Sequence, residues 1–113
     1  MSYTQTQIIP GSLLTNAAAI YYTCPANIVG TKISTLTVFN SDTVARTATI
    51  YLASSSSAPS AVDEIAVVQL QSLQSVVIYQ AINALLIPGN TIQAKADTGS
   101  VVSIKATGVV ITV

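Results

Sequence analysis

The residues with reactive side chains are few, and they do not form a familiar catalytic set. The chain has no His, and its single thiol is Cys24, next to Pro25. A Ser–His or Cys–His nucleophile pair therefore cannot be assembled, and neither can an internal disulfide or a Cys/His metal cluster. We interpret Cys24 as a small buried hydrophobe that carries a free thiol.

The carboxylates offer little acid–base or metal chemistry. Asp63 and Glu64 are adjacent, so on a strand their side chains would point to opposite faces. Asp42 and Asp97 lie in turn sequences, where aspartates cap backbone N–H groups. There is no Asp-x-Asp loop for calcium, although carbonyl oxygens with one aspartate leave calcium open as a minor alternative. We predict no catalytic residue, no metal site and no cofactor, and therefore a protein that is not an enzyme.

Aromatic side chains are the remaining candidates for recognition. Exposed tyrosines on a sheet can stack on sugars, whereas tyrosines elsewhere fill cores or the rims of subunit interfaces. We favour the core or interface role and keep a glycan-binding platform as the weaker alternative. The candidate interface residues are Tyr3, Ile8, Ile9, Tyr21, Tyr51 and Tyr79.

Charge is unusually scarce. Four Lys or Arg and four Asp or Glu make up 7% of the 113 residues, and the net charge is zero, whereas ordinary domains carry about 25% charged residues. Such a chain has no electrostatic means of binding nucleic acid or an acidic membrane. A surface so poor in charge is weakly protected against association, so we expect a homo-oligomer, a dimer or a trimer.

The ends of the chain suggest no targeting segment. Met1–Gln5 is polar and lacks the basic start and apolar run of a signal peptide. The longest uninterrupted apolar stretch, Ala17–Tyr22, is far shorter than a membrane span. We therefore expect synthesis in the cytoplasm without a signal peptide.

The elements that would carry these residues are strands. Val, Ile and Thr are abundant, and turn residues interrupt the apolar runs at the spacing typical of sandwiches and barrels. The fold class expected is all-β, an antiparallel β-sandwich or jelly-roll-like fold of about seven or eight short strands. The predicted strands are Thr4–Ile9 (ended by Pro10–Gly11), Ala19–Cys24, Lys32–Asn40, Arg46–Ala53, Ile65–Leu70, Ser75–Gln80, Ile92–Ala96 and Val102–Val113, with a bulge at Gly108.

Several details follow from local pattern. Arg46–Ala53 alternates as a strand with one buried face, with Ala48, Ile50 and Leu52 inward and Thr47, Thr49 and Tyr51 outward. Ser54–Ser60 is interpreted as a flexible connection or a loop ordered against a neighbour. Asp97–Ser100 is predicted to be a hairpin turn. The last strand is apolar and uncharged, so it must be paired within the chain or with another chain.

The expected organisation is a polar N-terminal arm or edge strand, residues 1–17, followed by one sandwich domain, residues 18–113. An arm with so few core-like residues could reach onto a neighbouring subunit.

Four segments resemble small virion proteins of tailed bacteriophages. Ala18–Asn27, Ala-Ala-Ile-Tyr-Tyr-Thr-Cys-Pro-Ala-Asn, is similar to their opening strand. Ile33–Asn40 and Thr47–Leu52 match the hydrophobic strand and the Thr-rich strand that follow in them, separated by an Asn-containing turn. Leu86–Ala94 is similar to the segment before their final hairpin. The resemblance begins at about Ala18 and rests on turn residues and alternation.

This resemblance implies a β-sandwich in the phage particle and no catalytic residues. It implies a capsid cement or decoration protein that stabilises the head through contacts with the major capsid protein or other virion proteins. The alternative is a tail or neck module that binds a receptor or a glycan.

Overall fold

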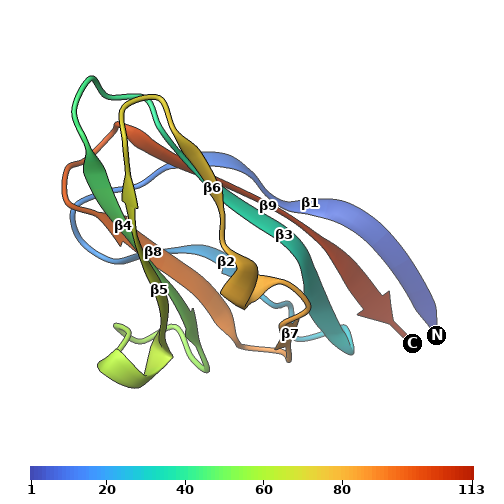
Figure 1. Ribbon diagram of the computed structural model, residues 1–113. Coiled ribbons are helices and arrows are strands. Elements are labelled where there is room, and N and C mark those ends of the chain that lie inside the picture. Colours follow the sequence, from blue (N-terminus) through green and yellow to red (C-terminus); the bar gives the residue numbers. More distant parts are fainter.

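The structure, a computed structural model, describes all residues from Met1 to Val113 and is an elongated sandwich of two antiparallel sheets, 46 × 26 × 20 Å (Figure 1). The larger sheet has the order β1-β9-β3-β6, with β7 also paired to β3, and the smaller has the order β2-β8-β4-β5. The predicted all-β sandwich is confirmed. The strands are β1 (Ser2–Leu13), β2 (Ala19–Thr23), β3 (Gly30–Asn40), β4 (Arg46–Ala53), β5 (Glu64–Leu70), β6 (Ser75–Val77), β7 (Leu85–Leu86), β8 (Thr91–Ala96) and β9 (Val102–Thr112).

The core lies between the two sheets and follows the period of two that the sequence displays. Leu36 and Val38 of β3 and Ile104 of β9 face Ile50 of β4 and Ile92 of β8, and each of these side chains is fully buried. β-Branched and aliphatic side chains on alternating positions fill the layer between two sheets, as expected of a sandwich.

Most connections cross between the sheets. The predicted hairpin at Asp97–Ser100 is wrong, because β8 belongs to the smaller sheet and β9 to the larger. The turn is instead held by other parts of the chain. The Asp97 N–H donates to the Thr47 carbonyl at 3.0 Å, and the Ser100 N–H donates to the Leu14 carbonyl at 3.0 Å. A tight turn sequence therefore joins two layers here.

β1 continues through Pro10–Gly11, where the sequence predicted its end. It runs to Leu13, with register shifts on either side of Ile9. β1 is an edge strand with β9 as its one neighbour in the sheet, so a proline without an N–H is tolerated on it. Gly11 has φ 145°, a conformation that other residues rarely adopt.

The outer face of β4 is covered, contrary to the prediction of one buried face. Thr49 and Tyr51 are each 7% exposed. The serine loop folds over the neighbouring residues: Gln93 Nε2 donates to the Ser57 carbonyl at 3.0 Å, and Thr91 Oγ1 donates to the Ser55 carbonyl at 2.8 Å. The loop is thus ordered against the chain's own smaller sheet.

Gly108 lies where the ladder of the larger sheet is irregular on both sides. The register shifts between Gln7 and Ile9 on β1 and between Ile33 and Thr35 on β3. A Cβ at Gly108 would lie 2.7 Å from the Lys32 carbonyl oxygen. The predicted bulge at Gly108 is therefore wrong in its strand: Gly108 is paired on both sides, and the extra residues are Ile8 on β1 and Ser34 on β3.

The predicted strand Ser75–Gln80 ends early. β6 stops at Val77, and a short 3₁₀ helix, η2 (Tyr79–Ala81), follows. Ile78 N–H donates to the Leu36 carbonyl at 2.8 Å, and the 3₁₀ turn then buries Ala81 completely. A second 3₁₀ helix, η1 (Ala61–Asp63), precedes β5.

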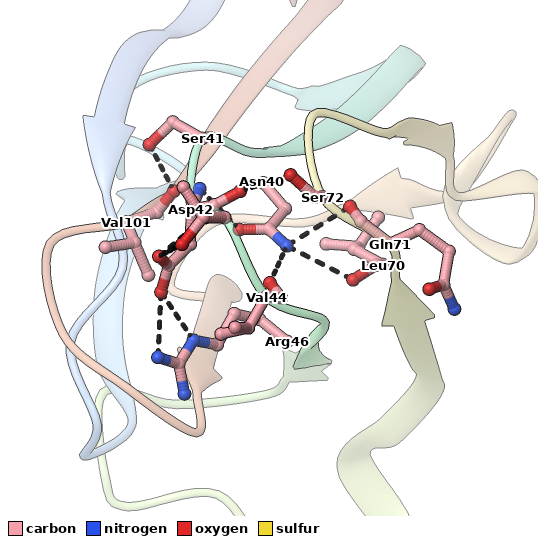
Figure 2. A network of polar contacts seen from close by, with 10 residues as sticks. Asn40, Ser41, Asp42, Val44, Arg46, Leu70, Gln71, Ser72 and Val101 are labelled. Atoms are coloured by element: carbon pink, nitrogen blue, oxygen red, sulfur yellow. Dashed lines mark hydrogen bonds and ion pairs between the residues drawn. The ribbon is translucent and has the colours of Figure 1, made fainter.

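A buried asparagine joins the two sheets at one end of the sandwich (Figure 2). Asn40 is fully buried, and its Nδ2 donates to the carbonyls of Val44 at 2.9 Å and of Leu70 and Gln71 at 3.2 Å each. Its Oδ1 accepts from the Asp42 N–H at 2.9 Å. The amide therefore ties the connection after β3 to the end of β5 and to the connection that follows β5.

Candidate interaction surface

The surface hollows gather little chemistry. One of them, about 250 Å³, lies on the outer face of the larger sheet, and Lys105 is its one ionisable side chain. A second, about 240 Å³, holds Lys95 and Asp97 beside threonines on the smaller sheet. No group of three or more Cys, Asp and Glu side chains lies together. No helix has the length and apolar character that a membrane crossing requires.

The thiol lies inside a buried polar cluster. Cys24 is 1% exposed, and its Sγ–H donates to the Leu86 carbonyl at 3.3 Å. Thr31 Oγ1 lies 3.7 Å from this sulfur and 2.7 Å from Tyr22 Oη. Burial raises the pKa of Tyr22 above its ordinary value, and its hydrogen bond to Thr31 lowers it in part. These contacts link β2 to β3 and β7, so the cluster has a structural role.

The candidate interface residues from the sequence do not form one surface. Tyr3 and Tyr79 are 65% and 76% exposed, and Tyr21 is half-buried. Ile8, Ile9 and Tyr51 are buried in the chain itself and offer little surface to a partner. The interface role of these six residues stays a prediction.

One end of the molecule differs from the rest because it lies beyond the core. We define the N-terminal tip as Ser2–Gln7 of β1 paired with Thr107–Thr112 of β9. Every side chain from Ser2 to Gln7 is exposed. Both chain termini lie at this end, beside each other (Figure 1). The tip is therefore a sheet extension whose first strand contributes nothing to the core.

The tip also presents a free strand edge. The Ile111 carbonyl accepts from the Val29 N–H at 2.8 Å, so the backbone groups of Ile111 face β3. Tyr3 lies opposite Ile111 and is consequently a non-hydrogen-bonded partner, with its own N–H and C=O directed away from β9. By alternation, Gln5 and Gln7 also direct their backbone groups outward. These unpaired groups are a template for another strand.

Exposed apolar side chains surround this end. Val29 precedes β3, Leu85 is the first residue of β7, and Ile87 follows β7, which pairs with the start of β3. With Tyr3 and Val113 they are exposed on neighbouring strands and loops at one end of the sandwich. Nothing in the sequence marks Val29, Leu85 and Ile87 as interface residues, because the topology that brings them to the termini has no signal in local pattern.

Comparison with known proteins defines the fold. No protein-family model matches the sequence, and no curated protein matches it significantly. Among solved structures, a chain of the Bacillus endospore appendages, described as disulfide-linked pili, is 12% identical with a TM-score of 0.58, over 99% of this chain and 89% of that one. A chain of the acid-stable capsid of Helicobacter pylori bacteriophage KHP30 is 6% identical with a TM-score of 0.51, over 97% and 93%.

A third chain, from the capsid of cyanophage Pam1, is 18% identical over 99% of this chain and 83% of its own. Its TM-score of 0.41 is too low to support an argument. At these identities the likeness concerns the β-sandwich fold, which this chain shares with a pilus protein and a phage capsid protein along almost the whole length of each.

Proposed function

We propose that this chain is a non-enzymatic structural subunit of a virion, and more specifically a capsid cement or decoration protein. The observation that carries the proposal is the N-terminal tip: an uncharged strand with an unpaired edge, surrounded by exposed apolar side chains. Such a surface binds through shape and backbone hydrogen bonds.

The charge distribution supports an assembly role over a catalytic one. Asp42 and Arg46 form an ion pair at 2.7 Å. Besides this pair, the charged side chains of the whole molecule are three Lys, two Asp and one Glu. None of the surface hollows brings two carboxylates together. Contacts with other virion proteins would then consist of apolar patches and strand edges.

Two comparisons support the same class of role. The solved chains whose fold is similar are parts of a pilus and of a phage capsid. The words that describe them name pili in one case and a capsid in the other. The resemblance of Ala18–Asn27 and Leu86–Ala94 to small phage virion proteins favours the virion among such assemblies.

The copy number of this polypeptide in a purified virion tests the proposal. A cement or decoration protein is expected at a number equal to, or a fixed fraction of, the major capsid protein. Particles that lack it are expected to lose their contents at lower temperature than complete ones. A few copies per particle, with unchanged head stability, would favour the tail or neck module with a receptor or glycan as its ligand. Absence from the particle would overturn the virion role.

A further inference from the structure

The first half of β1 is held to its own chain by backbone hydrogen bonds alone. No side chain from Ser2 to Gln7 is buried, and the one side-chain hydrogen bond there, from Tyr3 Oη to Met1 Sδ, stays within the terminus. Ordering the backbone of a residue costs conformational entropy, and the net contribution of one hydrogen bond is too small to offset that cost by itself. This segment therefore has no buried side chain to help offset the cost of order.

A break in the strand separates this segment from the anchored half. Gln7 lies opposite Thr107 and Ile9 opposite Ala106, so Ile8 is an extra residue with its side chain buried. Beyond the break Ile9 and Leu14 lie in the core, and the Leu14 N–H donates to the Val102 carbonyl at 2.7 Å. Ile8 marks the point at which the tip can detach while the rest of β1 stays in place.

Detachment of this segment would expose the edge of β9, with which another strand could pair. The last residues of β9, Gly108–Thr112, would keep β3 on one side and lose their partner on the other. The freed edge contains Val109, Val110 and Ile111 and carries no charge. An apolar, uncharged strand edge readily accepts another strand. Ser2–Gln7 of a second copy fits this edge in the same register because its sequence is identical.

We propose that Ser2–Gln7 is exchanged between two copies of this chain, so that each segment pairs with β9 of its partner and the chain turns at Ile8. Exchange of an identical element reforms the hydrogen bonds that it breaks, and it is a low-cost route to association. The driving contribution is the covering of exposed apolar side chains at the tip, Tyr3, Val29, Leu85 and Ile87 among them. The contact belongs to the purified chain and does not depend on the virion role.

A cross-strand disulfide distinguishes exchange from simple edge pairing. Tyr3 and Ile111 are a non-hydrogen-bonded pair, with a Cα separation of about 4.5 Å in such ladders, within the range that a disulfide bridges. The variant Tyr3→Cys/Ile111→Cys is concentrated, oxidised, treated to block free thiols and run on a non-reducing denaturing gel. We expect covalent dimers or a ladder of multimers that increases with the protein concentration before oxidation.

The matched control is Leu13→Cys/Ser103→Cys, the corresponding pair in the anchored half of the same two strands. We expect a disulfide within one chain, which migrates as a monomer. If Tyr3→Cys/Ile111→Cys also gives monomers at every concentration, the exchange is overturned. Multimers from both pairs would mean that all of β1 is exchanged and would overturn the turn at Ile8.

A second pair of variants covers the case in which the cysteine variant does not fold. The backbone of Thr4 faces β9 and that of Gln5 faces solvent, so Thr4→Pro removes a ladder donor and Gln5→Pro does not. We expect Thr4→Pro to keep the wild-type thermal transition within a few degrees and to lose self-association by light scattering, whereas Gln5→Pro keeps both. Unchanged self-association of Thr4→Pro would overturn the exchange.

Discussion

Gly108 is the residue at which the larger sheet requires the absence of a side chain. An added Cβ would lie 2.7 Å from the Lys32 carbonyl oxygen and 3.3 Å from Ile8 Cδ1. Since the first of these neighbours is backbone, it cannot move aside cheaply. Gly99 offers a comparison, because a Cβ there would meet nothing within 4 Å.

We expect Gly108→Ala to lower the free energy of unfolding by about 1–3 kcal/mol, the usual cost of overpacking. Gly99→Ala should be neutral or slightly stabilising, since alanine reduces the freedom of the unfolded chain. Urea denaturation of both variants measures the difference. Equal midpoints for the two would contradict the close approach at Gly108.

Asp42 is the residue that links stability to acid pH. The hydrogen bond from Arg46 Nε at 2.8 Å, followed by that from the Thr43 N–H, lowers the pKa of Asp42 below its ordinary value. A carboxyl whose pKa is lower in the folded chain contributes stability above its unfolded-state pKa, near 3.9. That contribution is lost as the pH falls through the lower, folded-state value.

Arg46→Gln should therefore have a lower Tm than the wild type at neutral pH, by a small amount because the pair is on the surface. The difference should disappear in strongly acidic buffer, where Asp42 is protonated in both proteins. Thermal melts followed by circular dichroism at a series of pH values measure it. If the Tm difference between the two proteins persists in acid, Arg46 stabilises the fold through packing and not through its ion pair with Asp42.

At the scale of elements, alternation in the sequence predicted where most strands lie but not which strands pair. Lys32–Asn40 and Arg46–Ala53 match β3 and β4 closely, because one apolar residue in two is a local signal. The assignment of β8 and β9 to different sheets depends on the packing of whole strands. A turn such as Asp97–Ser100 has the same residues whether it closes a hairpin or crosses layers, so the hairpin prediction failed.

The covered outer face of β4 shows the same limit. Thr49 and Tyr51 have the types expected of a half-exposed strand, and the loop that bonds to the neighbouring strand β8 is low-complexity serine. Its hydrogen bonds run from the side chains of Thr91 and Gln93 to backbone carbonyls of the loop, which any residue would supply. No property of the serines themselves could have predicted this packing.

Gln93→Leu should release the serine loop while leaving the sheet intact. Three hydrogen bonds of Gln93 Nε2 are lost, to the carbonyls of Ser55 and Ser57 and to Thr91 Oγ1. We expect cleavage within Ser54–Ser60 by a non-specific protease to accelerate several-fold, with a loss of roughly 1–3 kcal/mol in global stability. Gln69→Leu, at an exposed position on β5, is the control. Equal cleavage rates would show that the loop is not held by Gln93.

At the scale of the whole molecule, the scarcity of charge predicted association, but not the surface that would serve it. The candidate residues chosen from the sequence include side chains that the fold buries, such as Ile9 and Tyr51. The exposed end instead collects Val29, Leu85 and Ile87, which are ordinary aliphatic residues in sequence. Their proximity follows from the order of strands in the larger sheet.

We expect the purified protein to be a dimer or trimer at high micromolar concentration. Since few ion pairs are available, its association should change little between low and high salt. Multi-angle light scattering at several concentrations and ionic strengths tests this. A monodisperse monomer throughout would contradict it, and dissociation in moderate salt would show that charges contribute more than the surface suggests.

Ser2 lies opposite Thr112 on adjacent antiparallel strands, and this adjacency of the two ends has a practical consequence. A reporter domain fused to either terminus emerges at the same place and would cover it. A short linker between the ends, of the length found in natural hairpin loops, would instead give a cyclic backbone. In the cyclised protein the first strand is tethered to the last, so head-to-tail ligation would give a form of this chain that holds its own edge closed.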